Sequence, residues 1–178
     1  ALIARTIKAA GIKRAFGILG GGRSLDLVTA LIEEEVTYHP VHFEGSAAIM
    51  AGVTGLLTEN VGLALAIKGP GIANMIPGLT ACRFENFPMV ALTEAYEKVS
   101  GDAVPMHKRL DHQALTGEVV KGSGFCGVGE ETINEAIALA KKEAPGPVHL
   151  DLVEHGQDNL SESFENQDLT RLSIEKRK

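Results

Sequence analysis

Glu44 is the residue best placed in this sequence to do chemistry. It lies in the stretch HFEGSAAIMAG (residues 42–52), between a short extended segment and a run of small residues typical of a closely packed helix. Ligands of parallel sheets gather at the carboxyl ends of the strands, which is where this order puts Glu44. A carboxylate in that position can hold or transfer a proton. The alternative is that Glu44 is only a favourable anion in the first turn of a helix.

Gly20 and Gly21 belong to a run of three glycines that follows the first apolar segment of the chain. Glycine permits backbone conformations and close approaches that a side chain would block, so this loop is a candidate to border a ligand. A loose turn explains the same residues equally well.

Gly69, Pro70 and Gly71 follow the most apolar segment and precede a predicted helix. Proline followed by glycine is typical of a type II turn, which here presents backbone groups at the start of the helix. With Asn74, the turn half matches the dinucleotide-binding pattern Gly-x-Gly-x-x-Gly, and Glu94 is then a candidate ribose ligand. Simple turn chemistry and a contact with a phosphate or cofactor are both compatible with these residues.

The remaining reactive side chains form no known catalytic or metal-binding pattern. Cys82 and Cys126 are isolated in the sequence and are expected to be free, buried thiols rather than a disulfide. The six histidines show no metal-ligand spacing, so we predict that the chain holds no metal of its own. Neither a Gly-x-Ser-x-Gly elbow nor a Walker-type phosphate loop is present.

Length and charge restrict the class of protein. A chain of 178 residues with 44% hydrophobic residues is long enough for one domain with a sizeable core. The net charge of −6 and the scattered basic residues disfavour nucleic-acid binding. No apolar run reaches the roughly 18 residues of a membrane span, and no signal peptide is recognisable. We therefore predict a cytoplasmic protein that binds neither nucleic acid nor membrane.

Helical and extended segments alternate along the chain. This alternation and the nearly continuous apolar strands predict a three-layer α/β/α sandwich with a six-stranded, mainly parallel sheet. The expected helices cover residues 2–10, 24–34, the segment from Glu44 to about 58, 72–82 and 130–142. The expected strands cover residues 14–18, 36–41, 62–67, 88–92, 118–121 and 147–152. Residues 157–178 are polar, cannot bury enough apolar surface to fold alone, and are expected to be a tail or linker.

Four stretches in register carry a resemblance to a known family. They are residues 15–21 (AFGILGG), Glu44 with the small residues that follow it, residues 69–74 (GPGIAN) and residues 146–151 (GPVHLD). Across roughly residues 1–154 the chain resembles the pyrimidine-binding domain of thiamine diphosphate (ThDP) enzymes of the acetolactate synthase and 2-oxo acid decarboxylase group. The resemblance implies such a domain at residues 1–156.

What the resemblance implies for Glu44 is specific. The family's glutamate at this position hydrogen-bonds the aminopyrimidine of the cofactor, promotes its imino tautomer and so activates it for attack on a 2-oxo acid. It implies further that the loop of Gly20 and Gly21 borders the pyrimidine. The same holds for the other predicted cofactor contacts, which are Gly69, Pro70, Gly71 and Asn74.

The resemblance also implies that this chain carries only half of an active site. In the family a separate diphosphate-binding domain holds Mg²⁺ through a Gly-Asp-Gly…Asn pattern, which does not occur here. We therefore expect a fragment of a longer enzyme or a small subunit, working in a homo- or hetero-oligomer. The implied reaction is decarboxylation or carboligation of a 2-oxo acid. A non-catalytic scaffold subunit and a nucleotide-binding α/β module are the alternatives.

Three positions depart from the family pattern. Leu19 stands where the family often has proline. Lys68 stands where serine or threonine usually precedes the Gly-Pro-Gly turn. Lys108 falls, by spacing alone, at the position of the family's active-site glutamine. His107 or Lys108 could face a substrate carboxylate, but a solvated loop explains this segment as well.

Overall fold

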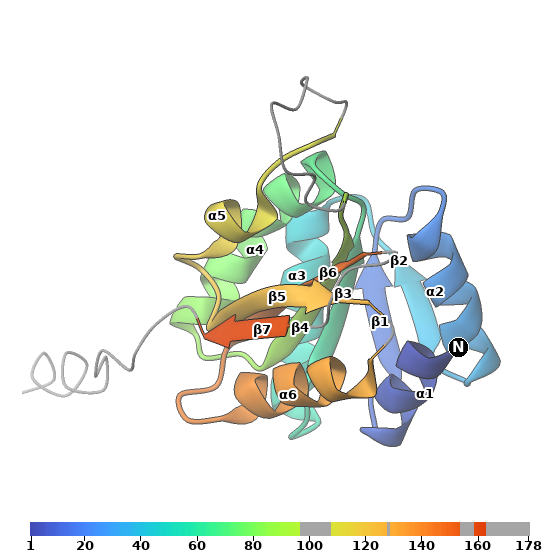
Figure 1. The fold of residues 1–178 in the computed structure, drawn as a ribbon. Helices are drawn as coiled ribbons and strands as arrows, with labels where there is room; N and C mark the ends of the chain where they lie inside the picture. The colour runs from blue at the N-terminus through green and yellow to red at the C-terminus, as the bar shows by residue number, and fades with distance from the viewer. Residues whose placement is uncertain (97–107, 128, 154–158, 163–178) are drawn as a thin grey trace, which may run out of the picture.

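A computed structural model of the protein describes residues 1–96, 108–127, 129–153 and 159–162 (Figure 1). The helices are α1 (Leu2–Ala9), α2 (Arg23–Glu33), α3 (Glu44–Leu57), α4 (Pro70–Phe84), α5 (His112–Thr116) and α6 (Glu130–Lys141). The strands are β1 (Arg14–Gly17), β2 (Thr37–Pro40), β3 (Gly62–Ala66), β4 (Met89–Glu94), β5 (Gly122–Cys126), β6 (Pro147–Leu152) and β7 (Asn159–Glu162). None of the helices in the described part is long and apolar enough to cross a membrane.

All the strands join one sheet in the order β2-β1-β3-β4-β6-β5-β7. Strands β1 to β6 pair in parallel, and β7 pairs antiparallel with β5. The predicted parallel sheet of six strands is therefore confirmed, and β7 extends it by one. Every parallel connection needs a crossover, and because the strand order runs in both directions from β1, the crossover helices lie on both faces of the sheet.

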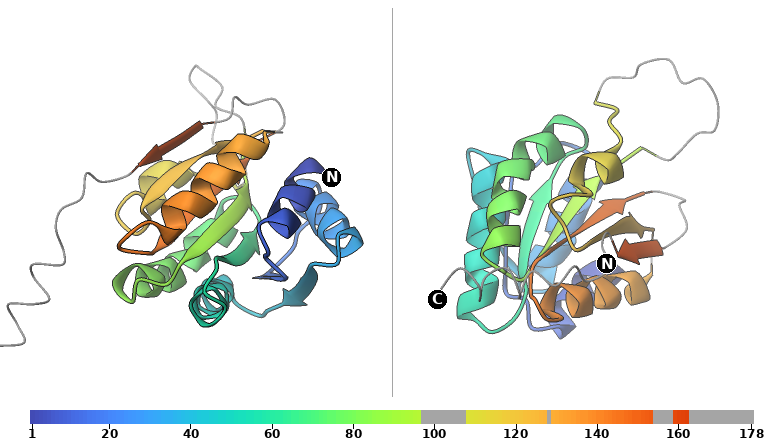
Figure 2. Two further views of the ribbon diagram at one scale, coloured as in Figure 1. Left: turned by 90° about the horizontal axis from the view of Figure 1, so that it is seen from below. Right: turned by 90° about the vertical axis from the view of Figure 1, so that its left-hand side faces the viewer.

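Each face of the sheet carries its own hydrophobic core. Apolar side chains of α1, α2 and α6 pack on one face, and those of α3 and α4 pack on the other. Figure 2 shows this separation, with α3 and α4 on one side of the sheet and α6 on the opposite side. The central strands β3, β4 and β6 are buried along their whole length, as expected for strands covered on both faces. The predicted three-layer α/β/α sandwich is confirmed.

One predicted strand was placed wrongly. Residues 118–121 were expected to be a strand, but the strand β5 begins at Gly122. The Thr116 carbonyl accepts hydrogen bonds from the backbone N–H groups of Val119 and Val120, which closes a turn after α5. Val120 is fully buried from within that turn. Val120 is therefore buried by the turn and not by a strand. The glycine-rich sequence GSGFC forms a strand because it pairs with the neighbouring strand β6.

The segment predicted to be a polar tail or linker, residues 157–178, contributes four residues to the sheet. Strand β7 lies in that segment and pairs with β5 over residues 159–162. Residues 163–178 lie outside the described part of the chain. The domain limit at residue 156 stays a prediction.

Both cysteines are buried free thiols, as predicted. Cys82 lies between α3 and α4, where its thiol donates a hydrogen bond to the Ala48 carbonyl at 3.4 Å. Burial raises the pKa of Cys82 to about 12, so this thiol stays protonated and unreactive at neutral pH.

Candidate active site

The order of the strands produces a topological switch point at the carboxyl edge of the sheet. Strand β1 lies between β2 and β3, so the loops that leave β1 and β3 lead to helices on opposite faces. Ligands of open parallel sheets bind at such switch points. The glycine-rich loops after β1 and β3 flank this point, and the loop after β2 brings Glu44 to the same edge. The predicted site residues therefore share one edge of the sheet.

Glu44 is the first residue of α3 and is only 6% exposed. Its Oε2 accepts a hydrogen bond from Asn74 Nδ2 at 3.2 Å, across 30 residues of sequence. Asn74 lies in the first turns of α4, directly after the Gly-Pro-Gly turn. The start of α3 adds the favourable field of a helix N-terminus around the carboxylate. The structure thus joins two of the predicted site residues, a buried carboxylate and a more exposed amide, in one hydrogen bond.

This contact depends on a close approach between α3 and α4. A Cβ placed on Gly78 of α4 would lie 2.2 Å from the carbonyl oxygen of Gly45 and 2.8 Å from the Ala48 Cβ. Only glycine at position 78 lets the two helices approach so closely. Gly45 is next to Glu44, and Gly78 lies about one helical turn after Asn74. The small residues of the two helices therefore set the distance between the carboxylate and the amide.

The loop after β1 packs against the end of β3. A Cβ on Gly20 would lie 2.7 Å from Ile67 Cγ2, so Gly20 is required for packing. A Cβ on Gly21 would meet no atom of the described residues within 4 Å. Gly22 has a φ of +71°, a conformation that favours glycine, and begins the turn into α2. Gly21 therefore faces open space at the same edge of the sheet as Glu44.

Glu94, the candidate ribose ligand, is already paired through both oxygens. Its Oε1 accepts a hydrogen bond from the Ser24 backbone N–H at 2.6 Å, and its Oε2 lies 3.1 Å from Lys68 Nζ. Burial alone would raise the pKa of Glu94, but the hydrogen bonds from Ser24 and the charge and hydrogen bond of Lys68 outweigh it and lower the pKa. A paired carboxylate has little capacity left for a ribose. Glu94 is therefore a poor candidate for the acidic ribose ligand that the dinucleotide-binding interpretation requires.

The Lys68–Glu94 pair explains why lysine stands at position 68, where the family usually has serine or threonine. Lys68 Nζ also lies 4.7 Å from the centre of the Tyr96 ring, a cation–π distance. The ammonium group thus ties the loop after β3 to the end of β4 and, through Glu94, to the start of α2. A serine or threonine at position 68 is too short to make these contacts.

Replacing Lys68 by Met is expected to lower the free energy of unfolding by about 2 kcal/mol at pH 7, because the buried Glu94 carboxylate loses its ammonium partner. The pKa of Glu94 in the folded protein lies below its ordinary value of 4.5. The paired carboxylate therefore stabilises the fold above that pH, and this contribution is lost as the pH falls through the lowered pKa. The difference between wild type and variant should shrink toward about pH 3. Urea denaturation at both pH values measures it.

Lys8→Met is the matched control. Lys8 pairs with Glu35 at the same 3.1 Å, but the Glu35 side chain is 85% exposed. A solvated pair contributes little, so we expect a change within about 0.5 kcal/mol at either pH. Equal effects of the two substitutions would show that Glu94 does not depend on Lys68.

The sequence analysis missed a group of buried polar residues at the ends of β4 and β6. Asp151 Oδ1 accepts hydrogen bonds from the Thr93 hydroxyl at 2.8 Å and from the His112 Nδ1–H at 2.6 Å. His149 Nε2 lies 2.8 Å from the Thr93 hydroxyl oxygen. All four side chains are less than 5% exposed. The signal for this cluster was a histidine and an aspartate in the otherwise apolar strand β6.

Burial by itself would raise the pKa of Asp151. The charge of His149, with the hydrogen bonds from His112 and His149, more than offsets this and holds the pKa well below its usual range. Asp151 is therefore ionised at neutral pH, and it is the anionic centre of the cluster.

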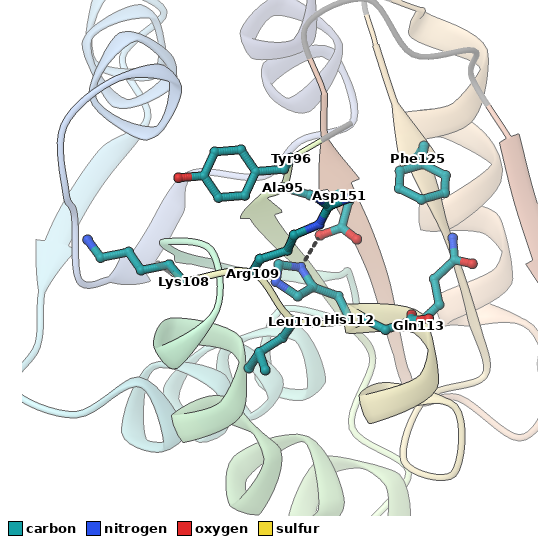
Figure 3. Close-up of a pocket in the computed structure, with 10 residues that line it drawn as sticks. Ala95, Tyr96, Lys108, Arg109, Leu110, His112, Gln113, Phe125 and Asp151 are labelled. Atoms are coloured by element: carbon teal, nitrogen blue, oxygen red, sulfur yellow. Dashed lines mark hydrogen bonds and ion pairs between the residues drawn. The ribbon is translucent and has the colours of Figure 1, made fainter. Parts of the chain in front are cut away.

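A cavity of about 220 Å³ opens beside this cluster (Figure 3). Its wall includes Tyr96, Lys108 and Arg109, and His112 and Asp151 also line it. Lys108, which falls by spacing alone at the family's glutamine position, lines this cavity, with its side chain pointing away from the His112–Asp151 pair (Figure 3). His107 lies outside the described residues.

Residues 1–115 match the family described as thiamine pyrophosphate enzyme, N-terminal TPP binding domain. Among curated proteins, the chain is 30% identical over 155 residues to the catabolic acetolactate synthase of Raoultella terrigena, covering 85% of this chain and 27% of that protein. It is 31% identical to the large subunit of acetolactate synthase isozyme 3 of Escherichia coli K12, covering 85% of this chain and 27% of that one. It is 24% identical to 2-hydroxyacyl-CoA lyase 1 of Dictyostelium discoideum, covering 85% of this chain and 26% of that one. The chain spans about a quarter of the length of these relatives.

Proposed function

Because this chain belongs to the thiamine pyrophosphate enzyme family, as its N-terminal TPP binding domain, we propose that it binds the aminopyrimidine of ThDP at the Glu44 site. The proposal rests above all on the buried Glu44 carboxylate, which Asn74 holds at the carboxyl edge of the sheet. Glu44 is the proposed catalytic residue. The proposed cofactor contacts are Gly20, Gly21, Gly69, Pro70, Gly71 and Asn74.

The residues at this edge fit the chemistry of an aminopyrimidine. Such a ring needs a partner that can share a proton with a ring nitrogen, and a carboxylate supplies it. It also needs backbone surface that is not blocked by side chains, and in the part of the chain that the structure describes no atom lies within 4 Å of the place where a Gly21 Cβ would be. ThDP, when bound, supplies the nucleophilic carbon and the electron sink for reactions of 2-oxo acids.

Glu44 and Asn74 have different roles at the pyrimidine ring. Asn74 donates to Oε2 and so fixes the plane of the carboxylate. In the described part of the chain, Oε1 has no hydrogen-bond partner and is available to hold a proton at ring nitrogen N1′. Glu44 is only 6% exposed, and low exposure strengthens an interaction between the carboxyl group and the ring. A rigidly held proton acceptor of this kind is what general acid–base chemistry requires.

The reaction, substrate and partner follow from the family and are part of the proposal. We infer a lyase or transferase that acts on a 2-oxo acid, as a decarboxylase or an acetolactate synthase-like carboligase. A diphosphate-binding domain or subunit would hold Mg²⁺ and the diphosphate and complete the site. Exposed apolar residues on α3, among them Ile49, Met50 and Leu57, support packing against a further domain or chain in an oligomer. The cytoplasmic location stays a prediction from the sequence.

Native mass spectrometry of the gently purified protein, with a thiochrome assay for bound ThDP, tests the proposal. We expect the chain to be recovered together with a diphosphate-binding domain or subunit, with ThDP and Mg²⁺ in about equal amounts. Added pyruvate, a simple 2-oxo acid, should then be decarboxylated or ligated. A protein that carries the partner domain and still takes up no ThDP would contradict the proposal.

A further inference from the structure

His112, the first residue of α5, links two parts of the molecule that are distant in sequence. Its Nδ1 lies 2.6 Å from Asp151 Oδ1 at the end of β6, and its Nε2 lies 3.0 Å from the backbone nitrogen of Gly69. His112 is 4% exposed and Asp151 is 2% exposed. A buried chain of hydrogen bonds therefore runs from the Asp151 carboxylate to the Gly-Pro-Gly turn.

The directions of these hydrogen bonds determine the tautomer of the ring. The backbone nitrogen of Gly69 can only donate its N–H, so Nε2 of His112 must be unprotonated and must accept this hydrogen bond. The ring proton is then on Nδ1, where it is donated to the ionised Asp151. The imidazole is neutral, and both of its nitrogens are occupied. His112 therefore has no free nitrogen with which to act as a general base.

The same cluster has the composition of a metal site, but its hydrogen bonds favour another role. Candidate ligand atoms of His112, His149 and Asp151 lie within 4.8 Å of one another. A cation bound to Nδ1 of His112 would require that nitrogen to be unprotonated, while Gly69 requires the same of Nε2. A neutral imidazole carries one ring proton and cannot meet both demands. The geometry therefore points to a hydrogen-bonded relay.

Thr93 and His149 extend the relay beyond Asp151. The Thr93 hydroxyl donates to Asp151, so its oxygen accepts from Nε2–H of His149. Asp151 Oδ1 thus accepts from His112 and Thr93, and Nε2 of His149 lies a further 3.4 Å from the same oxygen. The Asp151 carboxylate orients the imidazole, and the imidazole orients the backbone of Gly69.

Gly69 is held on a second side by the same segment of chain. It has a φ of +68°, and a Cβ at this position would lie 2.4 Å from the carbonyl oxygen of Lys108. The residue is therefore clamped between the Lys108 carbonyl and the His112 ring. Pro70 begins α4 directly after it, and Asn74 follows within the first turns of that helix. The position of Gly69 therefore affects where α4 starts and how Asn74 reaches Glu44.

We propose that His112 is a positioning residue of the cofactor site, which acts by accepting the Gly69 N–H and so setting the Gly69–Pro70–Gly71 turn. This role rests on the proposed function, because that turn is a proposed ThDP contact. His112 is not among the proposed cofactor contacts. Because it also lines the 220 Å³ cavity, it connects that cavity with the turn.

Two substitutions in the full-length enzyme separate the two hydrogen bonds of His112. The side-chain amide of His112→Asn lies near the position of Nδ1, so it can still donate to Asp151 but cannot reach Gly69. The side-chain carbonyl of His112→Gln reaches the position of Nε2 and can still accept from Gly69. We expect His112→Asn to weaken ThDP binding about three- to tenfold, the effect of losing one hydrogen bond, and His112→Gln to stay within about twofold. Equilibrium dialysis measures the affinities.

Hydrogen exchange of the peptide that contains Gly69 provides a readout besides cofactor binding. Without added ThDP, its exchange should be about three- to tenfold faster in His112→Asn than in wild type, and nearly unchanged in His112→Gln. Equal exchange and equal affinity in the two variants would overturn the positioning role. A wild-type enzyme that binds no ThDP would instead contradict the proposed function, while the exchange data still report on the bond to Gly69.

The tautomer of His112 in the wild-type enzyme tests the positioning role even if a variant fails to fold. In wild-type enzyme labelled with ¹⁵N-histidine, NMR should show His112 as neutral, with its proton on Nδ1. Because that state is required for Nε2 to accept from Gly69, a proton on Nε2 would overturn the proposal.

Discussion

Replacing Glu44 by Gln is expected to lower kcat about 10²- to 10⁴-fold in the enzyme assembled with its diphosphate-binding partner, while the fold is kept. Glutamine has nearly the size of glutamate, and its carbonyl oxygen can still accept the hydrogen bond from Asn74. An amide, however, cannot hold and release a proton at ring nitrogen N1′. Steady-state turnover with a 2-oxo acid measures the loss, and urea denaturation checks the fold.

Glu130→Gln is the matched control for this experiment. Glu130 is also the first residue of a helix, α6, but it is exposed. If Glu44 were only a favourable anion in a helical first turn, both substitutions would cost about 0.3–1 kcal/mol of stability and leave turnover unchanged. If Glu44 activates the cofactor, only Glu44→Gln should lower kcat. A Glu44→Gln enzyme that keeps most of its turnover would contradict the assignment.

Gly78→Ala is expected to lower the free energy of unfolding by about 2–3 kcal/mol and to weaken ThDP binding at the same time. The added methyl group would lie 2.2 Å from the Gly45 carbonyl oxygen, so α3 and α4 must move apart. Alanine is the better helix former by about 1 kcal/mol, but overpacking against a backbone atom costs more. Separation of the helices also lengthens the Glu44–Asn74 hydrogen bond. Urea denaturation and equilibrium dialysis measure the two effects.

Gly117→Ala controls for the change in residue type alone. A Cβ on Gly117 would meet only the Gln113 carbonyl oxygen, at 3.3 Å, and Gly117 already has a helical φ of −50°. We expect its stability to stay within about 0.5 kcal/mol of wild type and its ThDP affinity to be unchanged. If Gly78→Ala behaved like this control, the close approach of the helices would not limit the site.

Most of the fold could be predicted because its signals are local. Apolar strands and helices of regular period follow one another along the chain, and these patterns depend on neighbouring residues only. The helix that begins at Glu44 and the buried strand over residues 62–66 are where the sequence places them. The strand β5 was misplaced because its glycine-rich sequence has little strand preference of its own, and pairing with β6 decides its conformation.

The candidate site could be predicted in part. Glu44, the two glycine-rich loops and Asn74 stand out by type and spacing, and the carboxyl edge of a parallel sheet gathers such loops. The pairing of Glu44 with Asn74, 30 residues apart, depends on how closely two helices approach. The engagement of Glu94 by Ser24 and Lys68, 70 and 26 residues away, also depends on the fold.

The sequence by itself determined the α/β architecture, the position of the proposed catalytic carboxylate and the membership in a cofactor-binding family. These follow from local conformational preference and from short motifs, which one segment of chain carries alone. Only the tertiary structure decided which polar groups meet. The Asp151–His112–Gly69 relay joins three loops and strands that no spacing in the sequence connects. Its bonds form because the strand order places the ends of β3, β4 and β6 side by side, and buried polar groups must find partners there.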